Sequence, residues 1–315
     1  MSLRILVTGS SGFIGRALVT ALASAGHWVR AASRARTALA DLPGVEWVAL
    51  PDLEGEVDWA PLVSHMDIVV HLAAIAHRSH IDSGQYARAN RAATVKLVRE
   101  CEAQGVKRLI FMSSIGAQAG SACDHVVTER DVPKPVTAYD RAKLAAEEEI
   151  RRLSAPFTIL RPVIVYGPGA KANIATIMRI AALPVPLPFG AFQNRRSLLS
   201  IENLIEAVIV CLANPGTINR TFIVSDPEPI SLAEMLSTLR AATGRPPYLI
   251  PFPPAAVRAL IVAVGHKSLW DRIGRDLVAS SADLQEVGWL PKVDTREGLR
   301  RMMKATMSLR RGHSK

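Results

Sequence analysis

Cysteine is scarce in this chain of 315 residues, and its spacing argues against a metal centre. The three cysteines show neither a paired spacing nor a zinc-binding pattern, so we expect reduced thiols in a cytoplasmic protein. His71, His77 and His80 lie close together in the sequence, but no cysteine or carboxylate completes a ligand set at a usual spacing. The sequence therefore predicts no metal site.

Aromatic residues make up only 5% of the chain, and no base-reading module is present. We therefore expect no nucleic-acid partner, although the formal net charge is +10. The excess of Lys and Arg favours anionic partners in general, and a phosphorylated small molecule satisfies it.

Long hydrophobic runs are also missing. The longest helical one, "PPAAVRALIVAVG", is interrupted by Arg258 and is too short to cross a bilayer. The N-terminal "MSLRILVTG" enters a strand pattern without the layout of a signal peptide. We expect a cytoplasmic protein with no integral membrane segment. The apolar run predicts a buried helix, with contact to a membrane surface as the alternative.

Short β-branched runs alternate with helical stretches along the chain. The runs are apolar on both faces, as in strands of a parallel sheet that is covered on both sides. Candidate helices end at Gly26 and Gly105, and glycine is the expected stop signal. This order predicts an α/β fold with a Rossmann-type doubly wound parallel sheet. The runs are "RILVTG", "WVRAAS", "VEWVAL", "DIVVHLAA", "RLIFMSS" and "FTILRPVIVYG".

A glycine-rich turn, "TGSSGFIGRAL", joins the first strand to the first helix. Gly9 and Gly12 would supply the turn and the close approach to a pyrophosphate, and Gly15 the packing of helix on strand. The pattern is weak evidence alone, but the required strand and helix flank it. We predict that a dinucleotide is bound here by Gly9, Ser11, Gly12, Phe13, Ile14 and Gly15.

The second strand ends in "AASRAR", where an acidic residue would bind the ribose of NAD. Arg34 and Arg36 stand there instead, and arginine accommodates the 2′-phosphate of NADP. The sequence predicts NADP as cofactor, with NAD as the alternative. Ordinary exposed arginines are the other interpretation.

Prolines become denser from about Gly167 onward. We therefore expect an NAD(P)-binding domain over 1–167, with 197–226 returning to it. Residues 168–196 and 227–315 are predicted to form a smaller C-terminal lobe that binds the substrate.

Five motifs in this order, "TGSSGFIG", "DIVVHLAA", "FMSS", "YDRAK" and "RPVIVYGPG", resemble the extended short-chain dehydrogenase/reductase family, and within it the NAD-dependent epimerase/dehydratase group that acts on nucleotide sugars. The resemblance implies that Tyr139 is the general acid/base, that Lys143 lowers its pKa and holds the nicotinamide ribose, and that Ser114 binds the reacting oxygen. Ser113 is the neighbouring alternative. A tyrosine has an ordinary pKa near 10, so we expect the ammonium and the nicotinamide charge to lower it.

The same resemblance implies further cofactor contacts. Residues 71–74 ("HLAA") would line the cofactor pocket through Leu72, Ala73 and Ala74. Asp52 would reach the adenine, with a plain surface carboxylate as the alternative. Asn90 in "RANRAA" resembles the structural asparagine of the family, and we group it with the cofactor-binding residues; a merely packed asparagine is the alternative.

The segment from "RPVIVYGPG" to "NRRSLLSIENL" resembles bacterial enzymes that reduce UDP-4-keto-6-deoxy-N-acetylhexosamines in polysaccharide synthesis. It implies that Arg196 faces the UDP pyrophosphate, with Arg195 as the alternate, and that Asn173 contacts the diphosphate or the ribose of uridine. Arg272 or Arg275 would close over the phosphates; exposed arginines are the alternative.

These residues bear on three possible activities, those of a dehydratase, a 4-ketoreductase and a 4-epimerase. A dehydratase would need a carboxylate pair in "SSIGAQAG", which has none, and Ile164 replaces an Asn typical of UDP-galactose epimerases. We predict an NADPH-dependent 4-ketoreductase of UDP-sugars, with an NAD-dependent UDP-sugar 4-epimerase as the alternative. A non-catalytic NADP-binding regulatory protein is the alternative from another class. The family also implies a homodimer through the helices 82–104 and 137–154.

Overall fold

The chain folds around a parallel sheet of seven strands in the order β11-β7-β5-β4-β1-β2-β3. The computed structural model describes residues 2–75, 83–263, 265, 270–271 and 273–312. The strand order reverses between β1 and β4, which confirms the predicted doubly wound α/β sheet. Its strands are β1 (Arg4–Thr8), β2 (Trp28–Ser33), β3 (Val45–Ala49), β4 (Ile68–His71), β5 (Arg108–Met112), β7 (Phe157–Pro162) and β11 (Arg220–Val224).

Helices cover both faces of this sheet. Along β1, Ile5 and Val7 belong to one core cluster and Leu6 to another, because successive side chains of a strand point to opposite faces. This is why the strand sequences are apolar throughout. The long helices α1 (Phe13–Ser24) and α8 (Ile201–Ala213) pack on the first face, and α4 (Ala93–Ala103) and α6 (Ala138–Arg152) pack on the second.

The predicted helix that ends at Gly105 is less regular than expected. Residues 87–92 form a π-helix, and α-helical geometry begins at Ala93. Such wide turns are frequent at functional sites. Gly26 and Gly105 follow their helices with φ of 81° and 66°, the left-handed conformation that a glycine stop signal requires. The short helices are α2 (Ala60–Val63), α3 (Ser83–Tyr86) and α5 (Ile115–Ala119), with 3-10 turns at Ala38–Asp41 and Pro215–Thr217.

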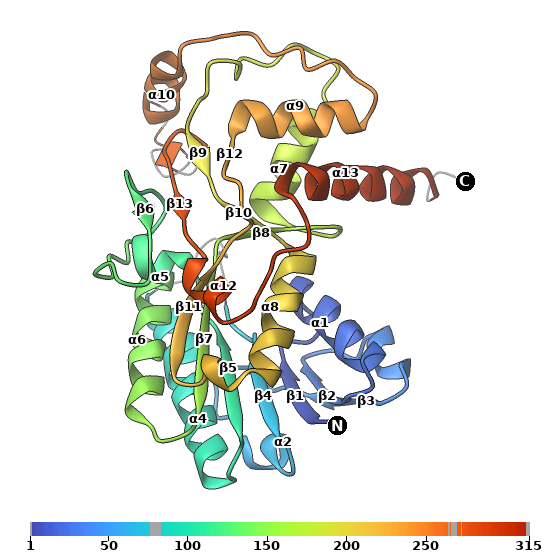
Figure 1. Cartoon of the computed structure of the whole chain (residues 1–315), viewed down its shortest axis with the longest axis vertical. Coiled ribbons are helices and arrows are strands. Elements are labelled where there is room, and N and C mark those ends of the chain that lie inside the picture. Colours follow the sequence, from blue (N-terminus) through green and yellow to red (C-terminus); the bar gives the residue numbers. More distant parts are fainter. Residues whose placement is uncertain (1, 76–82, 264, 266–269, 272, 313–315) are drawn as a thin grey trace.

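A smaller C-terminal lobe lies beyond the carboxyl ends of the strands, at the top of Figure 1. It has its own core cluster around Phe192, Leu236 and Met302. Its helices are α7 (Ala172–Ala181), α9 (Leu232–Ala242), α10 (Pro254–Ala263) and α13 (Thr295–Gly312), whereas the short α12 (Ala282–Glu286) packs on the main sheet through Leu284. Three strand pairs connect it to the main sheet: β8 (Ile164–Tyr166) with β10 (Leu198–Ser200), β9 (Arg195–Arg196) with β12 (Ile230–Ser231), and β6 (Val126–Val127) with β13 (Val278–Ala279).

A buried polar cluster joins the lobe to the sheet. Asp226 follows β11 and accepts hydrogen bonds from the Tyr166 hydroxyl at 2.9 Å and from Asn203 Nδ2 at 2.7 Å. Burial raises the pKa of Asp226 to about 6, and the hydrogen bonds from these donors oppose that rise. Asp226 is therefore a carboxylate at neutral pH. The cluster fixes the start of α8 against the lobe.

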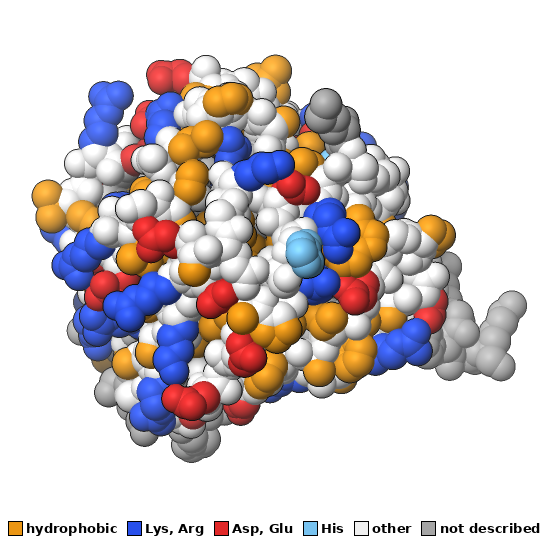
Figure 2. All heavy atoms as spheres, turned by 90° about the horizontal axis from the view of Figure 1, so that it is seen from below, with side chains coloured by type: hydrophobic (Ala, Val, Ile, Leu, Met, Phe, Trp, Pro, Cys, Tyr) orange, Lys and Arg blue, Asp and Glu red, His pale blue; other side chains and the backbone are white. Residues whose placement is uncertain are grey.

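The end of the molecule away from the lobe carries charges of both signs. Figure 2 shows Lys and Arg side chains interspersed with Asp and Glu on that lower face. Among the helices in the described ranges, none is both long and apolar enough to cross a membrane.

Candidate active site

The turn between β1 and α1 brings the backbone close to neighbouring segments. Gly9 has φ of 73°, and a Cβ there would lie 2.9 Å from the backbone nitrogen of Ala73. A Cβ on Gly15 would overlap the carbonyl of Gly9, so only glycine lets α1 pack on the turn. Gly12 caps α1, and Phe13 and Ile14 begin its first turn, where backbone N–H groups have no intrahelical acceptor.

A cavity of about 200 Å³ opens beside this turn. It runs from the glycines to the carboxyl ends of β2, β3 and β4. These walls offer close backbone approach, a guanidinium from Arg34 and a carboxylate from Asp52, which fits a dinucleotide. The cavity brings together eight predicted cofactor residues: Gly9, Ser11, Gly12, Arg34, Asp52, Leu72, Ala73 and Ala74. Sequence reasoning did not select the other lining residues: Ser33, Leu50, Pro51, Leu53 and Ile75.

Arg36 does not line this cavity. Its guanidinium pairs with Asp41 at 2.9 Å, and both side chains are mostly exposed. Arg34 and Arg36 were predicted together at the end of β2, but the chain turns after Ser33 and only Arg34 faces the cavity.

Asn90 shapes the cavity wall from behind instead of lining it. Its Oδ1 accepts from the N–H of Ile75 and its Nδ2 donates to the carbonyl of Ile75, both at 2.8 Å. The side chain is buried, and both polar atoms are used by the segment that follows β4. The structural asparagine expected from the family resemblance matches this contact. Asn90 does not line the cavity itself, and its grouping with the cofactor-binding residues stays a prediction.

His71 belongs to a buried hydrogen-bond chain. Its Nδ1 lies 2.8 Å from Thr8 Oγ1, and its Nε2 lies 3.1 Å from Thr94 Oγ1. Burial, assisted by the positive charge of Lys143, lowers the pKa of His71 to about 3, so the ring stays neutral. The chain ties β1 and β4 to α4 under the cavity. His77 and His80 lie outside the described residues.

The carboxyl end of β5 carries Ser114, which caps α5 and accepts from the N–H of Gly116 at 3.0 Å. Helix α5 packs on the start of α6, and a methyl group on Gly116 would clash with the carboxylate of Asp140. Asp140 forms a capping box with Thr137. Ser114 therefore lies beside the first turn of α6, which carries Tyr139.

Lys143 points from α6 to the end of β5. Its Nζ donates to the carbonyl of Met112 at 2.8 Å and lies 4.6 Å from the centre of the Phe111 ring. Burial lowers the pKa of Lys143 to about 8, while the nearby carboxylate of Glu147 opposes that shift. The carbonyl that the ammonium binds belongs to Met112, two residues before Ser114 in the chain. Lys143 therefore lies in the same corner of the site as Tyr139.

Tyr139 is half-buried, and its ring lies edge-on to that of Tyr86, with the centroids 6.0 Å apart. Desolvation raises the pKa of Tyr139 above its ordinary value, and the neighbouring Asp140 and Tyr86 add to the rise. We expected this pKa to be lowered. The protein's own groups do the reverse, because desolvation is the largest influence on this hydroxyl. The nicotinamide charge on which the expectation also rested belongs to the bound cofactor.

A buried ion pair supports this corner from behind. Glu147 is fully buried on α6, one turn after Lys143. Its carboxylate accepts from Arg161 of β7 at 2.9 Å and 2.5 Å and from Ser113 at 2.5 Å. Ser113 is committed to this network, whereas Ser114 is partly exposed beside Tyr139. The spacing Tyr139, Lys143, Glu147 places all three on one helical face, a signal that sequence reasoning could have used.

Asn173 and Arg196 line a second cavity, of about 350 Å³, in the C-terminal lobe. The guanidinium of Arg196 donates to the carbonyls of Arg275 at 3.0 Å and Ser121 at 3.1 Å. It therefore braces β9 against two other segments. The remaining walls are mostly apolar: Ile164, Ile174, Thr176, Ile177, Ile180, Phe189, Leu198, Ile230, Leu232, Met235, Leu236, Val257, Ile261 and Ile273.

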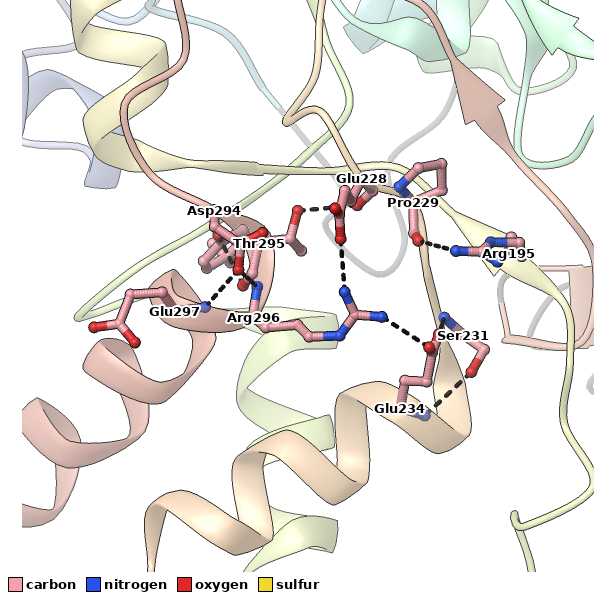
Figure 3. Close-up of polar contacts among 10 residues, drawn as sticks. Arg195, Glu228, Pro229, Ser231, Glu234, Asp294, Thr295, Arg296 and Glu297 are labelled. Atoms are coloured by element: carbon pink, nitrogen blue, oxygen red, sulfur yellow. Dashed lines mark hydrogen bonds and ion pairs between the residues drawn. The ribbon is translucent and has the colours of Figure 1, made fainter.

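Arg195 and Arg275, two other predicted substrate arginines, do not line this cavity. Figure 3 shows Arg195 donating to the carbonyl of Pro229, at 2.8 Å. The side chain of Arg275 is half exposed, with Asp271 4.0 Å away. Arg272 lies outside the described residues. Figure 3 also shows Arg296 between Glu228 and Glu234, a pairing that no motif suggested.

The sequence model of the NAD dependent epimerase/dehydratase family matches residues 5–224. A UDP-glucose 4-epimerase of Vibrio cholerae is 33% identical, over 96% of this chain and 94% of the relative.

Two solved structures share the fold. The UDP-glucuronic acid 4-epimerase of Bacillus cereus in complex with NAD superposes with a TM-score of 0.78 at 20% identity, over 98% of this chain and 99% of that one. MoeE5 in complex with UDP-glucuronic acid and NAD gives 0.77 at 25% identity, over 97% and 99%. The family match covers more than half of the chain, and it includes the glycine turn, Ser114, Tyr139 and Lys143. The chain therefore belongs to the NAD-dependent epimerase/dehydratase family of enzymes.

Proposed function

We propose that this enzyme uses NADPH to reduce the 4-keto group of a UDP-4-keto-6-deoxy-N-acetylhexosamine. The observation that carries the proposal is the position of Arg34, which lines the cofactor cavity at the end of β2 beside Ser33. A carboxylate there would bind the ribose of NAD, whereas a guanidinium attracts a 2′-phosphate. Because NADPH is the usual reductant, this favours a reductase.

The glycine turn would hold the pyrophosphate of the dinucleotide, Asp52 its adenine and Lys143 its nicotinamide ribose. When bound, the reduced cofactor supplies the hydride that C4 of the sugar accepts. As C4 is reduced, its oxygen gains negative charge, and Tyr139 donates its phenolic proton to that oxygen. Ser114 would hydrogen-bond the same oxygen, and water would return a proton to Tyr139.

The raised pKa of Tyr139 suits this direction of reaction. A ketone reduction needs a protonated acid at the start, and burial keeps the phenol protonated across neutral pH. Lys143, which carries its charge below about pH 8, would stabilise the tyrosinate that forms. Tyr139 then acts as the acid, Lys143 stabilises its tyrosinate, and the Ser114 hydroxyl orients the sugar oxygen.

For the substrate, we propose that residues 168–196 and 227–315 form the binding lobe and 1–167, with 197–226, the cofactor domain. Asn173 and Arg196 share a cavity wall, so they are the residues best placed to contact the nucleotide diphosphate. The guanidinium of Arg196 would have to exchange a carbonyl for a phosphate oxygen.

A UDP-sugar 4-epimerase is the second candidate, and the 33% identity to the Vibrio cholerae enzyme favours it. An epimerase begins by oxidising C4, so Tyr139 would act first as a base. The cofactor would then be retained and restored within each cycle.

One assay separates these functions. Purified protein is mixed with NADPH or NADH and a 4-keto UDP-N-acetylhexosamine generated in situ by a dehydratase, and loss of reduced nicotinamide absorbance is followed. We expect rapid loss with NADPH and much slower loss with NADH. No loss, together with NAD released on denaturation and conversion of a UDP-hexose to its C4 epimer, would replace the reductase by the epimerase.

The variant Arg34→Asp sharpens this test. It is expected to lower the ratio of kcat/KM for NADPH to that for NADH about 100-fold, because a charged hydrogen bond is lost and a like charge is introduced. Arg36→Asp is the matched control, since Arg36 is exposed and pairs with Asp41 away from the cavity. Equal effects of both substitutions would contradict the role of Arg34.

The pH dependence of kcat/KM offers an independent check. Since the pKa of Lys143 is about 8, the rate should be flat near neutrality and fall as the pH rises above that value and the ammonium loses its proton. Lys143→Arg keeps a positive charge in alkaline solution, so its slower reaction should lack this fall. A rate that increases with pH in the wild type would instead indicate a tyrosinate base.

A further inference from the structure

Six of the ten large hydrophobic side chains that the described residues expose gather at one end of the C-terminal lobe. They come from the loop before β9, the loop after α9 and helix α10, which Figure 1 places at the top of the molecule. We call this surface the apolar tip. Its members are Leu183, Val185, Tyr248, Ile250, Phe252 and Val262, with exposed fractions of 43% to 62%.

Hydrogen bonds hold the two loops of the apolar tip together. The two loops bind each other through backbone hydrogen bonds from Leu187 to Tyr248 at 2.9 Å and from Ile250 to Leu187 at 2.8 Å. Arg240, which is only 1% exposed, donates to the carbonyls of Leu183 at 2.8 Å and Val185 at 2.6 Å in one loop. It also donates to the carbonyl of Pro247 in the other loop. These contacts fix the apolar side chains in an outward orientation.

Helix α10 is apolar on both sides. Val257 and Ile261 face inward and line the cavity of the lobe. The outward residues Ala256, Ala259 and Val262 are exposed. A helix of this kind is normally buried or in contact with lipid, and the exposed Arg258 among these residues can reach a polar boundary with its long stem.

The charged residues in the two stretches that build the tip have one sign. The sequence contains no Asp or Glu from 153 to 201 or from 235 to 270, the two stretches that build this end of the lobe. Within them Arg179, Arg245 and Arg258 are exposed. Glu234 lies near Tyr248 in a shared hollow, but Arg296 pairs with it at 2.8 Å. The lower face differs, because both signs are mixed there (Figure 2).

We propose that the apolar tip docks on the surface of a membrane that contains anionic lipids. Its apolar side chains enter the boundary between headgroups and acyl chains, and the arginines contact lipid phosphates. Tyr248 has the amphipathic ring that is common at such boundaries. The proposal does not depend on the reaction that the active site performs.

Vesicle flotation with the full chain tests this docking. The vesicles contain about three parts phosphatidylethanolamine to one of phosphatidylglycerol, or phosphatidylcholine alone. We expect binding to the anionic vesicles that weakens with salt, and little binding to the neutral ones. The double variant Ile250→Asp/Phe252→Asp should reduce the bound fraction about tenfold, and Arg258→Glu should reduce the preference for anionic vesicles.

The control carries the same substitution at two exposed positions outside the tip, Val132→Asp/Leu290→Asp; their side chains are 76% and 70% exposed. It should bind vesicles as the wild type does. Absence of binding to anionic vesicles, or equal loss in the control, would overturn the proposal. So would a change from dimer to monomer caused by Ile250→Asp/Phe252→Asp in light scattering, since the tip would then be an interface between two copies. Reductase activity measured on each variant shows that the active site is intact, so a failure of docking is distinct from a failure of the proposed reaction.

Discussion

Replacing Tyr139 by phenylalanine is expected to lower kcat about 1,000-fold, because the hydroxyl that protonates the sugar oxygen is removed. The ring remains, and with it the edge-on contact with Tyr86, whose centroid lies 6.0 Å away. Binding of NADPH should therefore change little. The two quantities are measured separately, kcat by loss of NADPH absorbance and the Kd of NADPH by fluorescence titration.

The matched control is Tyr86→Phe, which removes a hydroxyl from the neighbouring ring. It should reduce kcat by about tenfold at most, because no proton transfer depends on it. A Tyr139→Phe enzyme that retained most of its activity would contradict the acid role. If it also retained its cellular function, the regulatory NADP-binding protein considered from the sequence would regain support.

The second large effect is on stability. Glu147→Gln is expected to lower the free energy of unfolding by about 3–5 kcal/mol, because it leaves the buried guanidinium of Arg161 without its counter-charge. Glu147 is fully buried, and Arg161 is only 3% exposed. The measurement is equilibrium unfolding in urea, followed by circular dichroism.

Glu149→Gln provides the comparison on the same helix. Glu149 forms ion pairs with Arg91 and Arg152, whose side chains are at least half exposed, so its loss should cost less than about 1 kcal/mol. Similar losses from the two substitutions would show that the buried pair contributes no more than a surface one. Since Glu147 also opposes the lowering of the Lys143 pKa, the Glu147→Gln enzyme should lose activity at a lower pH than the wild type.

Much of the fold follows from local features of the sequence. Six of the seven main strands were visible as apolar runs because burial on both faces leaves no alternation to obscure them. Gly9, Gly26 and Gly105 marked turns that only a positive φ allows, and all three adopt it. The π-helix at 87–92 was not predicted, because no residue type signals an extra residue in a helical turn.

The site was predictable in position and less so in its contacts. The sequence does not distinguish Arg34 from Arg36, because both follow the second strand. Their roles differ only in the folded chain, where Arg34 lines the cavity and Arg36 pairs with Asp41. The contact of Asn90 with Ile75, 15 residues earlier, and of Arg196 with Ser121 and Arg275 likewise depend on tertiary neighbours. The rise that the protein's own groups impose on the pKa of Tyr139 was not predicted, because desolvation could not be read from the motif. The lowering expected with the nicotinamide bound stays a prediction. The homodimer stays a prediction.

The edge position of β11 has a consequence for synthesis of the chain. Strand β7 receives its second neighbour only when Val224 has paired with Pro162, and the segments of the lobe lie between them in the sequence. At about 5–20 residues per second, the ribosome needs roughly 3 to 12 seconds to add those intervening residues. During that interval β7 is an open, apolar sheet edge of the kind that recruits other strands. A fragment ending near Gly167 would keep this edge permanently, so expression of the cofactor-binding half by itself requires the segment through Val224.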